Sequence, residues 1–176
     1  MLQKRVSFLV VQIFLICLAL SRASARPEIG IALDGAFSSD DPALAYGAQA
    51  ALRWGSIGAF VLVEHNLWIN FDTRNKVTLG CLNVAAGAEI FYFGRRARSS
   101  LAVGSSTLLF DTALNFRGES GVFFDLRPIG IRFPVFREQL FVVIDPLHLV
   151  IAAPIVGDLP LVLPQYRTTI AIEVVL

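Results

Sequence analysis

The sequence predicts an all-β protein, an antiparallel up-and-down transmembrane β-barrel of eight strands. Two observations lead to this class. Hydrophobic residues make up 55% of the chain, yet no stretch after residue 25 offers the roughly 18 uncharged apolar residues of a membrane-spanning helix. Apolar and polar residues instead alternate with a period of two over many stretches, as they do along strands with one apolar face. Only helices and closed barrels satisfy every backbone polar group in lipid, so a barrel is expected.

Residues 1–25 are expected to be a secretory signal peptide and are set apart from the fold. Two basic residues precede an apolar run at 6–20, and Ala23 and Ala25 supply the small residues that signal peptidase reads. An uncleaved anchor helix is the alternative, but this run falls short of the roughly 20 residues that span a bilayer. Cleavage after Ala25 leaves residues 26–176 as a single β-barrel domain, a suitable length for one domain.

The composition of the segment after the signal peptide excludes several function classes. It holds 12 Lys and Arg against 14 Asp and Glu, because three of the 15 basic residues lie in the signal peptide. The basic cluster at 95–98 is short and lacks interleaved aromatic residues, so nucleic-acid binding is not indicated. Cys81 is a lone cysteine, which excludes an intrachain disulfide. No metal-ligand spacing, phosphate-binding loop or dinucleotide motif occurs, and neither a metal nor a cofactor is expected.

Alternation of apolar with small or polar residues predicts the first four strands at 28–37, 46–54, 57–66 and 81–92. Tyr46 and Trp54 stand at the two ends of the second strand, where the aromatic girdles of a membrane barrel lie. Gly55 and Ser56 separate the second strand from the third. Two-residue connections favour glycine, so a tight hairpin is expected there.

The other four strands are expected at 98–110, 121–133, 139–151 and 165–176. In the last one, the even-numbered side chains from Tyr166 to Leu176 are apolar or threonine, whereas the other face carries two opposite charges. Pro128 shifts the alternation of its strand by one residue, which indicates a β-bulge. The stretch 139–151 is apolar on both faces and is interrupted at Pro146. It is assigned to a strand because a central proline costs a helix about 3 kcal/mol.

The connections between these strands alternate between short and long. Outer-membrane barrels have short turns on the periplasmic side and long loops outside, and an even strand number places both termini with the short turns. The short connections are expected at 55–56, 93–97 and 134–138, and the long ones at 38–45, 67–80, 111–120 and 152–164.

Charged and amide side chains on the inward faces of these strands form the candidate site. An eight-stranded barrel is wide enough only for side chains to fill it, so buried polar groups must pair with one another. We expect a salt-bridged, closed interior, with a narrow ion path as the alternative. The members of this interior polar network are Asp34, Gln49, Arg53, Glu64, Glu89, Asp125, Arg127, Arg167 and Glu173.

With its signal peptide, amphipathic strands of about ten residues and alternating loop lengths, the chain resembles the small eight-stranded bacterial outer-membrane β-barrels of the OmpX and OmpA type. The resemblance is one of architecture and covers the whole segment after the signal peptide. It implies a Gram-negative outer membrane, contact with membrane lipids, and delivery by periplasmic chaperones and the barrel assembly machinery. The chain departs from the pattern at Leu176, where such proteins usually end on an aromatic residue.

The expected function is a structural, adhesive or interaction role in the outer membrane, with residues 67–71 and 152–164 as contact surfaces. A soluble periplasmic lipocalin-like barrel with a hydrophobic ligand inside is the alternative. A narrow pore or a lipid-modifying enzyme is less favoured. Outer-membrane lipid A deacylases carry an H-x-S arrangement on a strand, but neither His65 nor His148 has a serine two residues later. No catalytic residue is therefore expected.

Overall fold

The computed structural model describes residues 27–38, 45–67, 78–110, 119–156 and 159–176. The expected signal peptide lies outside this part of the chain. No helix within the described ranges is long and apolar enough to cross a membrane. The strands in these ranges are β1 (Glu28–Phe37), β2 (Ala45–Trp54), β3 (Ile57–Asn66), β4 (Thr78–Tyr92), β5 (Ala97–Phe110), β6 (Glu119–Phe136), β7 (Leu140–Val156), β8 (Leu159–Pro160) and β9 (Leu163–Val175).

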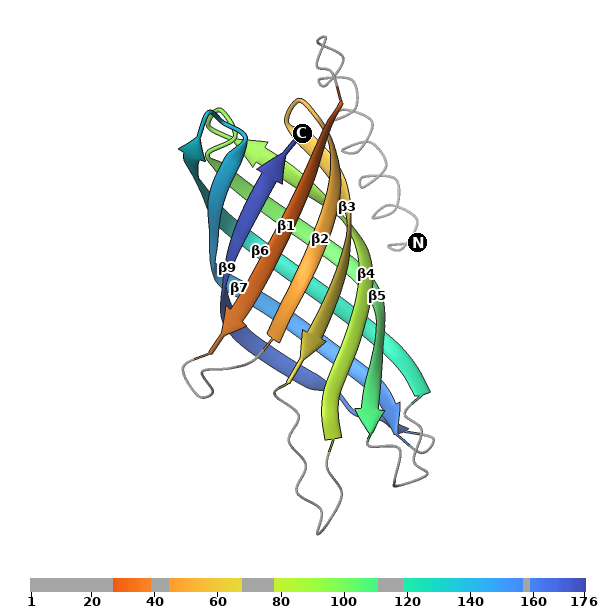
Figure 1. Ribbon diagram of the computed structural model, residues 1–176. Coiled ribbons are helices and arrows are strands. Elements are labelled where there is room, and N and C mark those ends of the chain that lie inside the picture. Colours follow the sequence, from red (N-terminus) through yellow and green to blue (C-terminus); the bar gives the residue numbers. More distant parts are fainter. Residues whose placement is uncertain (1–26, 39–44, 68–77, 111–118, 157–158) are drawn as a thin grey trace, which may run out of the picture.

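The strands form one closed antiparallel barrel (Figure 1). Each strand from β1 to β7 pairs with its neighbour in sequence. β9 pairs with β7 on one side and with β1 on the other, which closes the ring. β8 is a two-residue piece that pairs with the end of β7, so the wall itself has eight strands. The predicted eight-stranded, all-antiparallel barrel is confirmed.

Most strand boundaries match the prediction within three residues, and the largest differences lie at prolines. β1 and β3 begin and end as expected, whereas β6 continues to Phe136 and the third short turn is at 137–139. The predicted loop at 152–164 is wrong over much of its length, because β7 runs to Val156 and β9 starts at Leu163. Three prolines lie in this stretch, yet Pro154 still accepts a hydrogen bond from the Leu161 N–H at 2.8 Å. A strand tolerates proline where no N–H is needed for pairing.

Two neighbouring proline bulges interrupt the otherwise regular pairing. The β6–β7 register shifts between Leu126 and Ile129, which confirms the bulge predicted at Pro128. Pro146 does not end its strand, since β7 continues past it and shifts register against β9. Hydroxyl groups on adjacent strands satisfy both proline carbonyls. Ser99 Oγ donates to the Pro128 oxygen at 2.5 Å, and Thr168 Oγ1 donates to the Pro146 oxygen at 3.2 Å.

The two faces of the barrel wall differ sharply in polarity. Along β9, Ile170 and Ile172 are 45% and 58% exposed, while Thr169 and Glu173 on either side of them are 1% and 0% exposed. The same alternation runs through β2 and β3. The large exposed side chains of the described wall are thus apolar, and its buried side chains include many charges.

Both ends of the described chain lie at the same end of the barrel. In Figure 1 the start of β1, the end of β9 and the short turns at 55–56, 93–96 and 137–139 are at the top. The ends of β1, β3 and β5 and the starts of β2 and β4 are at the bottom. This is the arrangement that the alternating connection lengths predict.

Candidate functional site: the charged interior

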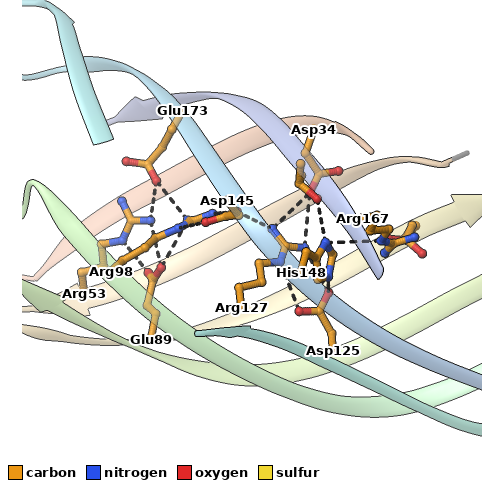
Figure 2. Close-up of polar contacts among 12 residues, drawn as sticks. Asp34, Arg53, Glu89, Arg98, Asp125, Arg127, Asp145, His148, Arg167 and Glu173 are labelled. Atoms are coloured by element: carbon orange, nitrogen blue, oxygen red, sulfur yellow. Dashed lines mark hydrogen bonds and ion pairs between the residues drawn. The ribbon is translucent and has the colours of Figure 1, made fainter. Parts of the chain in front are cut away.

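All nine predicted network residues lie on the inner side of the wall. Eight of them are at most 5% exposed, and the side chain of Asp34 is 7% exposed. Figure 2 shows many of these side chains meeting along the barrel axis. Across the described chain, the inward charges are carried by five arginines and six carboxylates. They are Arg53, Arg98, Arg127, Arg132, Arg167, Asp34, Glu64, Glu89, Asp125, Asp145 and Glu173.

The first group of charges lies near the short-turn end. Arg53 on β2 donates through Nε to Glu89 on β4 at 2.6 Å and through Nη2 to Glu173 on β9 at 2.7 Å. Arg132 on β6 also pairs with Glu173 and stacks on the ring of Phe141 at 4.0 Å. Each carboxylate here is held by strands that are far apart in the sequence. The group therefore links four strands of the barrel, which are β2, β4, β6 and β9.

The short-turn end is covered by the turn at 93–96. Arg95 donates to the Gly55 carbonyl through Nε at 2.8 Å and pairs with Glu28. Arg132 reaches the same turn and donates to the Arg95 carbonyl at 2.9 Å. The ring of Phe91 lies beneath, with the guanidinium carbon of Arg53 at 5.0 Å from its centroid. Aromatic rings and paired charges together close this end of the lumen.

The second group surrounds Arg127 in the middle of the barrel. Three carboxylates contact this guanidinium: Asp125 at 3.1 Å, and Asp34 and Asp145 both at 3.4 Å. Asp145 also accepts from Arg98 Nη2 at 2.7 Å, and Arg98 Nη1 lies 3.7 Å from Glu89 in the first group. Asp145 therefore connects the first group to the second. Charge-assisted bonds of this kind offset the large cost of placing the ions in a low dielectric.

His148 continues the network towards the long-loop end. Its Nε2 lies 2.8 Å from Asp125 Oδ2, and its Nδ1 lies 2.6 Å from Thr169 Oγ1. Arg167 Nε donates to the same Nδ1 at 3.3 Å. Because Nδ1 accepts the hydrogen bond from Arg167, the ring proton lies on Nε2, which donates it to the Asp125 carboxylate. The Thr, His and Asp are ordered as in hydrolase triads, but their exposed fractions are 1%, 0% and 0%.

The third group lies inside the barrel near the long-loop end. Arg167 on β9 pairs with Glu64 on β3, and Asn83 donates to Glu64 at 2.9 Å. Asn66 and Gln165 bridge the same two sides of the barrel at 2.9 Å. Eight of the nine predicted network residues thus occupy three linked groups along the axis, with Gln165 and the two asparagines as added members. Gln49 is also buried inside the barrel, but it takes part in none of these contacts.

Apolar side chains fill the space that the charges leave. Phe60, Leu62 and Phe123 form the centre of a buried cluster, and Leu163 packs against it from β9. Cys81 and Leu108 form a second small cluster that also contacts Leu163. The thiol of Cys81 is 0% exposed. These contacts close the long-loop side of the interior.

Close approach of charged groups requires glycine at several inward positions. A Cβ at Gly130 would lie 2.1 Å from Asp145 Oδ1, and a Cβ at Gly30 would lie 2.6 Å from Arg53 Nη1. Any larger residue would push the ion pairs out of place. These inward glycines make room for the network.

Several members of the network were missed by sequence reasoning. Asp145 and His148 both face inward because the bulge at Pro146 resets the alternation of β7. Arg98 and Arg132 follow the regular alternation of their strands and are 1% and 3% exposed. Alternation along β5 places Arg98 on the inward face, and alternation along β6 after its bulge does the same for Arg132. The sequence pattern could therefore have predicted both arginines.

The remaining histidine does not join the network. His65 faces outward, and its Nδ1 lies 2.7 Å from the hydroxyl oxygen of Tyr46, directly across the β2–β3 ladder. Its neighbour Glu64 points into the barrel. The 64–66 segment therefore does not bring an acid and a base together. In the described residues, no group of three or more His, Cys, Asp or Glu is arranged to hold a metal ion.

A solved structure shares this architecture. The fold is that of the small eight-stranded outer-membrane barrels. The match is the crystal structure of Neisserial surface protein A, with a TM-score of 0.54 and 12% sequence identity. It covers 84% of this chain and 94% of that chain. No family model matches the chain, and no curated protein matches its sequence.

Proposed function

We propose that this protein is an outer-membrane β-barrel with a structural, adhesive or interaction role and a closed interior. One observation carries the proposal: polarity is inverted relative to a water-soluble protein. Glu173 and Arg53 are 0% and 1% exposed, whereas apolar side chains such as Ile172 are 58% exposed. A wall of this kind is suited to lipid, which solvates apolar side chains and leaves charges to pair inside.

The expected location in the outer membrane has independent support. The sequence begins with a segment of signal-peptide character, and the fold matches that of a protein described as a Neisserial surface protein. The short turns and both described chain ends share one end of the barrel (Figure 1), which corresponds to the periplasmic side in outer-membrane barrels. Periplasmic chaperones and the barrel assembly machinery are then the expected partners during biogenesis.

Contact with other molecules would occur at the long-loop end. Residues 68–71 of the first predicted contact surface lie outside the described chain. The second surface is reduced by the extension of β7 and β9, and within it Pro160 and Val162 are exposed at the long-loop end. A role through external contacts is consistent with a lumen that ion pairs and apolar side chains fill.

A soluble lipocalin-like barrel is less well supported. Such a barrel holds its ligand in an apolar cavity and presents a polar outer surface. Here charged side chains such as Arg127 and Asp125 occupy the centre, and aliphatic side chains such as Val61, 56% exposed, cover the outside. Both faces have the opposite polarity to the one that a lipocalin requires.

Catalysis and ion conduction are also not proposed. The Thr169–His148–Asp125 arrangement is enclosed, and Arg167 donates to the same ring nitrogen that contacts the threonine. A substrate would have to displace these paired groups before reaching the hydroxyl. The same pairing fills the path that an ion would take, so we assign the network a structural role.

The decisive experiment is fractionation of expressing cells, combined with gel migration of unheated and heated samples. We expect the protein in the outer-membrane fraction, with a folded form that migrates differently until it is boiled. Recovery from the soluble periplasm would overturn the proposal and favour the lipocalin-like alternative. Recovery in the inner membrane would contradict the location while leaving the barrel fold in place.

A further inference from the structure

An apolar hairpin end extends beyond strand β5 at the short-turn end of the barrel. The last ladder pair between β5 and β6 is Ala97 with Ile131, and the Arg132 N–H still donates to the Arg96 carbonyl at 2.8 Å. Beyond this point the described pairing of β6 is with β7. Residues 133–136 therefore extend four residues beyond β5, roughly 13 Å along the strand at about 3.3 Å per residue. On the other side of the hairpin, β7 stays paired with β9 up to Gln139. We call residues 133–138 the β6–β7 tip.

Both faces of the tip are exposed, unlike the wall from which it extends. Phe133 and Val135 on one side are 48% and 58% exposed, and Phe136 on the other is 54% exposed. Phe93 in the adjacent turn is 84% exposed. Pro134 lies on the free edge, where its lack of an N–H prevents strand addition by another chain. Large apolar side chains gathered in this way indicate a contact with something other than water.

The tip is continuous with the apolar wall of the barrel. The outward row of β6 runs from Ile129 through Ile131 to Phe133 and Val135, with exposed fractions of 57%, 41%, 48% and 58%. No charged residue interrupts this row on the outward face. If lipid covers the wall, as the proposed function requires, the same lipid surface extends to the tip.

Arginines stand beside these apolar groups. The guanidinium carbon of Arg137 lies 5.1 Å from the ring centroid of Phe136. Arg96 in the neighbouring turn pairs with Glu138 at 3.2 Å, and both side chains remain largely exposed. Aromatic rings with guanidinium groups at their rim suit the boundary between acyl chains and phosphate headgroups. A protein partner would not require the unbroken apolar row that leads back into the wall.

We propose that the β6–β7 tip is a lipid anchor, resting on the membrane location proposed above. Phe133, Val135 and Phe136 enter the acyl–headgroup boundary of the leaflet on the short-turn side. Arg137 binds lipid phosphate there as a cation stacked on Phe136. The hairpin end is then embedded in the membrane interface and does not project into the periplasm.

Three valine or isoleucine positions with the same exposed fraction allow a matched test. Val135 in the tip, Val162 at the opposite end of the barrel and Ile172 in the wall are each 58% exposed. Each is replaced singly by cysteine in a Cys81→Ala background. The proteins are purified from membranes, spin-labelled, and placed in vesicles of phosphatidylethanolamine and phosphatidylglycerol. Accessibility to oxygen and to a water-soluble nickel chelate then reports depth.

We expect the label at Val135 to be several-fold less accessible to the nickel chelate than the label at Val162, and to resemble the one at Ile172. Equal chelate access at Val135 and Val162, with Ile172 still in lipid, would overturn the anchor and leave the proposed membrane location intact. Chelate access at Ile172 would overturn the membrane location itself. Protection of Val135 in cells but not in vesicles would show a protein partner and contradict the lipid assignment.

The phosphate contact has its own variant. In the Val135→Cys protein, Arg137→Glu is expected to raise the chelate accessibility of the label towards the value at Val162. Arg137→Lys keeps the positive charge, so the label should stay at the membrane interface with low chelate accessibility. Gel migration of unheated samples verifies that each variant is folded. Unchanged depth in Arg137→Glu would refute the role of the arginine.

Discussion

Arg53 on the second strand donates to Glu173 on the last strand at 2.7 Å, across 120 residues of sequence. Glu173 is also paired with Arg132 and is 0% exposed. One carboxylate thus contacts two cations from opposite sides of the lumen. Removal of a buried partner leaves the other charges without compensation, and this costs far more than the net value of the pair.

Glu173→Ala is therefore expected to destabilise the barrel by about 3–5 kcal/mol. The measurement is urea-induced unfolding in detergent micelles, followed by the shift in gel migration. Glu138→Ala is the control, because it breaks an exposed ion pair with Arg96. The side chains of Glu138 and Arg96 are 75% and 49% exposed. Pairs of that kind contribute about 0–1 kcal/mol. Equal effects of the two variants would contradict the importance of the interior network.

Gly130→Ala is expected to cost about 1–3 kcal/mol through overpacking. The added methyl group would lie 2.1 Å from Asp145 Oδ1 and 2.9 Å from Arg98 Cγ, so it would displace the pair that links two groups of charges. Gly35→Ala is the matched control, because the nearest atom to its Cβ is 3.7 Å away on Phe37. In the unfolding titration, we expect the stability of Gly130→Ala to be lower than that of the wild type, and the stability of Gly35→Ala to be unchanged or higher. A tolerated Gly130→Ala would refute the close packing of the network.

Ser99→Ala is expected to destabilise the wall by about 1–3 kcal/mol, because the Pro128 carbonyl then loses the hydroxyl that satisfies it. Lipid offers that carbonyl no replacement donor. Ser105→Ala, an outward-facing serine of the same strand, is the comparison and should have a smaller effect. The same unfolding titration compares the two. A larger loss in Ser105→Ala would show that the bulge needs no hydroxyl partner.

The closed lumen predicts that the wild-type protein gives no stable single-channel currents in planar bilayers. Arg127 with its three carboxylates fills the centre, and the rings of Phe91 and Phe141 lie at the short-turn end. Currents that appear in wild type and vanish in Arg53→Ala would establish conduction through the lumen. Arg96→Ala changes an exposed pair and serves as the control.

The sequence predicts the barrel well because each strand carries the evidence for its own inward face. Asp34, Arg53 and Glu173 could be assigned inward from alternation alone, without knowledge of neighbouring strands. Partner choice could not be predicted. The contact of Arg53 with Glu173 depends on how far β9 is staggered against β1, and Asp34 reaches Arg127 across the lumen.

Bulges account for the other omissions. Alternation predicts one inward residue in every two, but Pro146 lets Asp145 and His148 face inward three positions apart. The stretch 152–164, which contains three prolines, is predicted as a loop, although β7 runs through Pro154 and β9 runs through Pro164. A proline indicates the loss of an N–H at its position. It does not indicate whether a neighbouring carbonyl or hydroxyl restores the pairing.

The closing strand also sets a condition on the order of assembly. β9 supplies Arg167 for Glu64 of β3, and Glu173 for Arg53 of β2 and Arg132 of β6. A partial sheet made of β1 to β7 leaves Glu64 and Arg132 without these counterions and Arg53 with Glu89 alone, and lipid would not accept the unpaired charges. The earlier strands therefore have to keep their inner face in water until the C-terminal strand arrives. In the proposed outer-membrane location, entry into the bilayer and closure of the ring would then be one step, set by the pairing of β9 with β1 and β7.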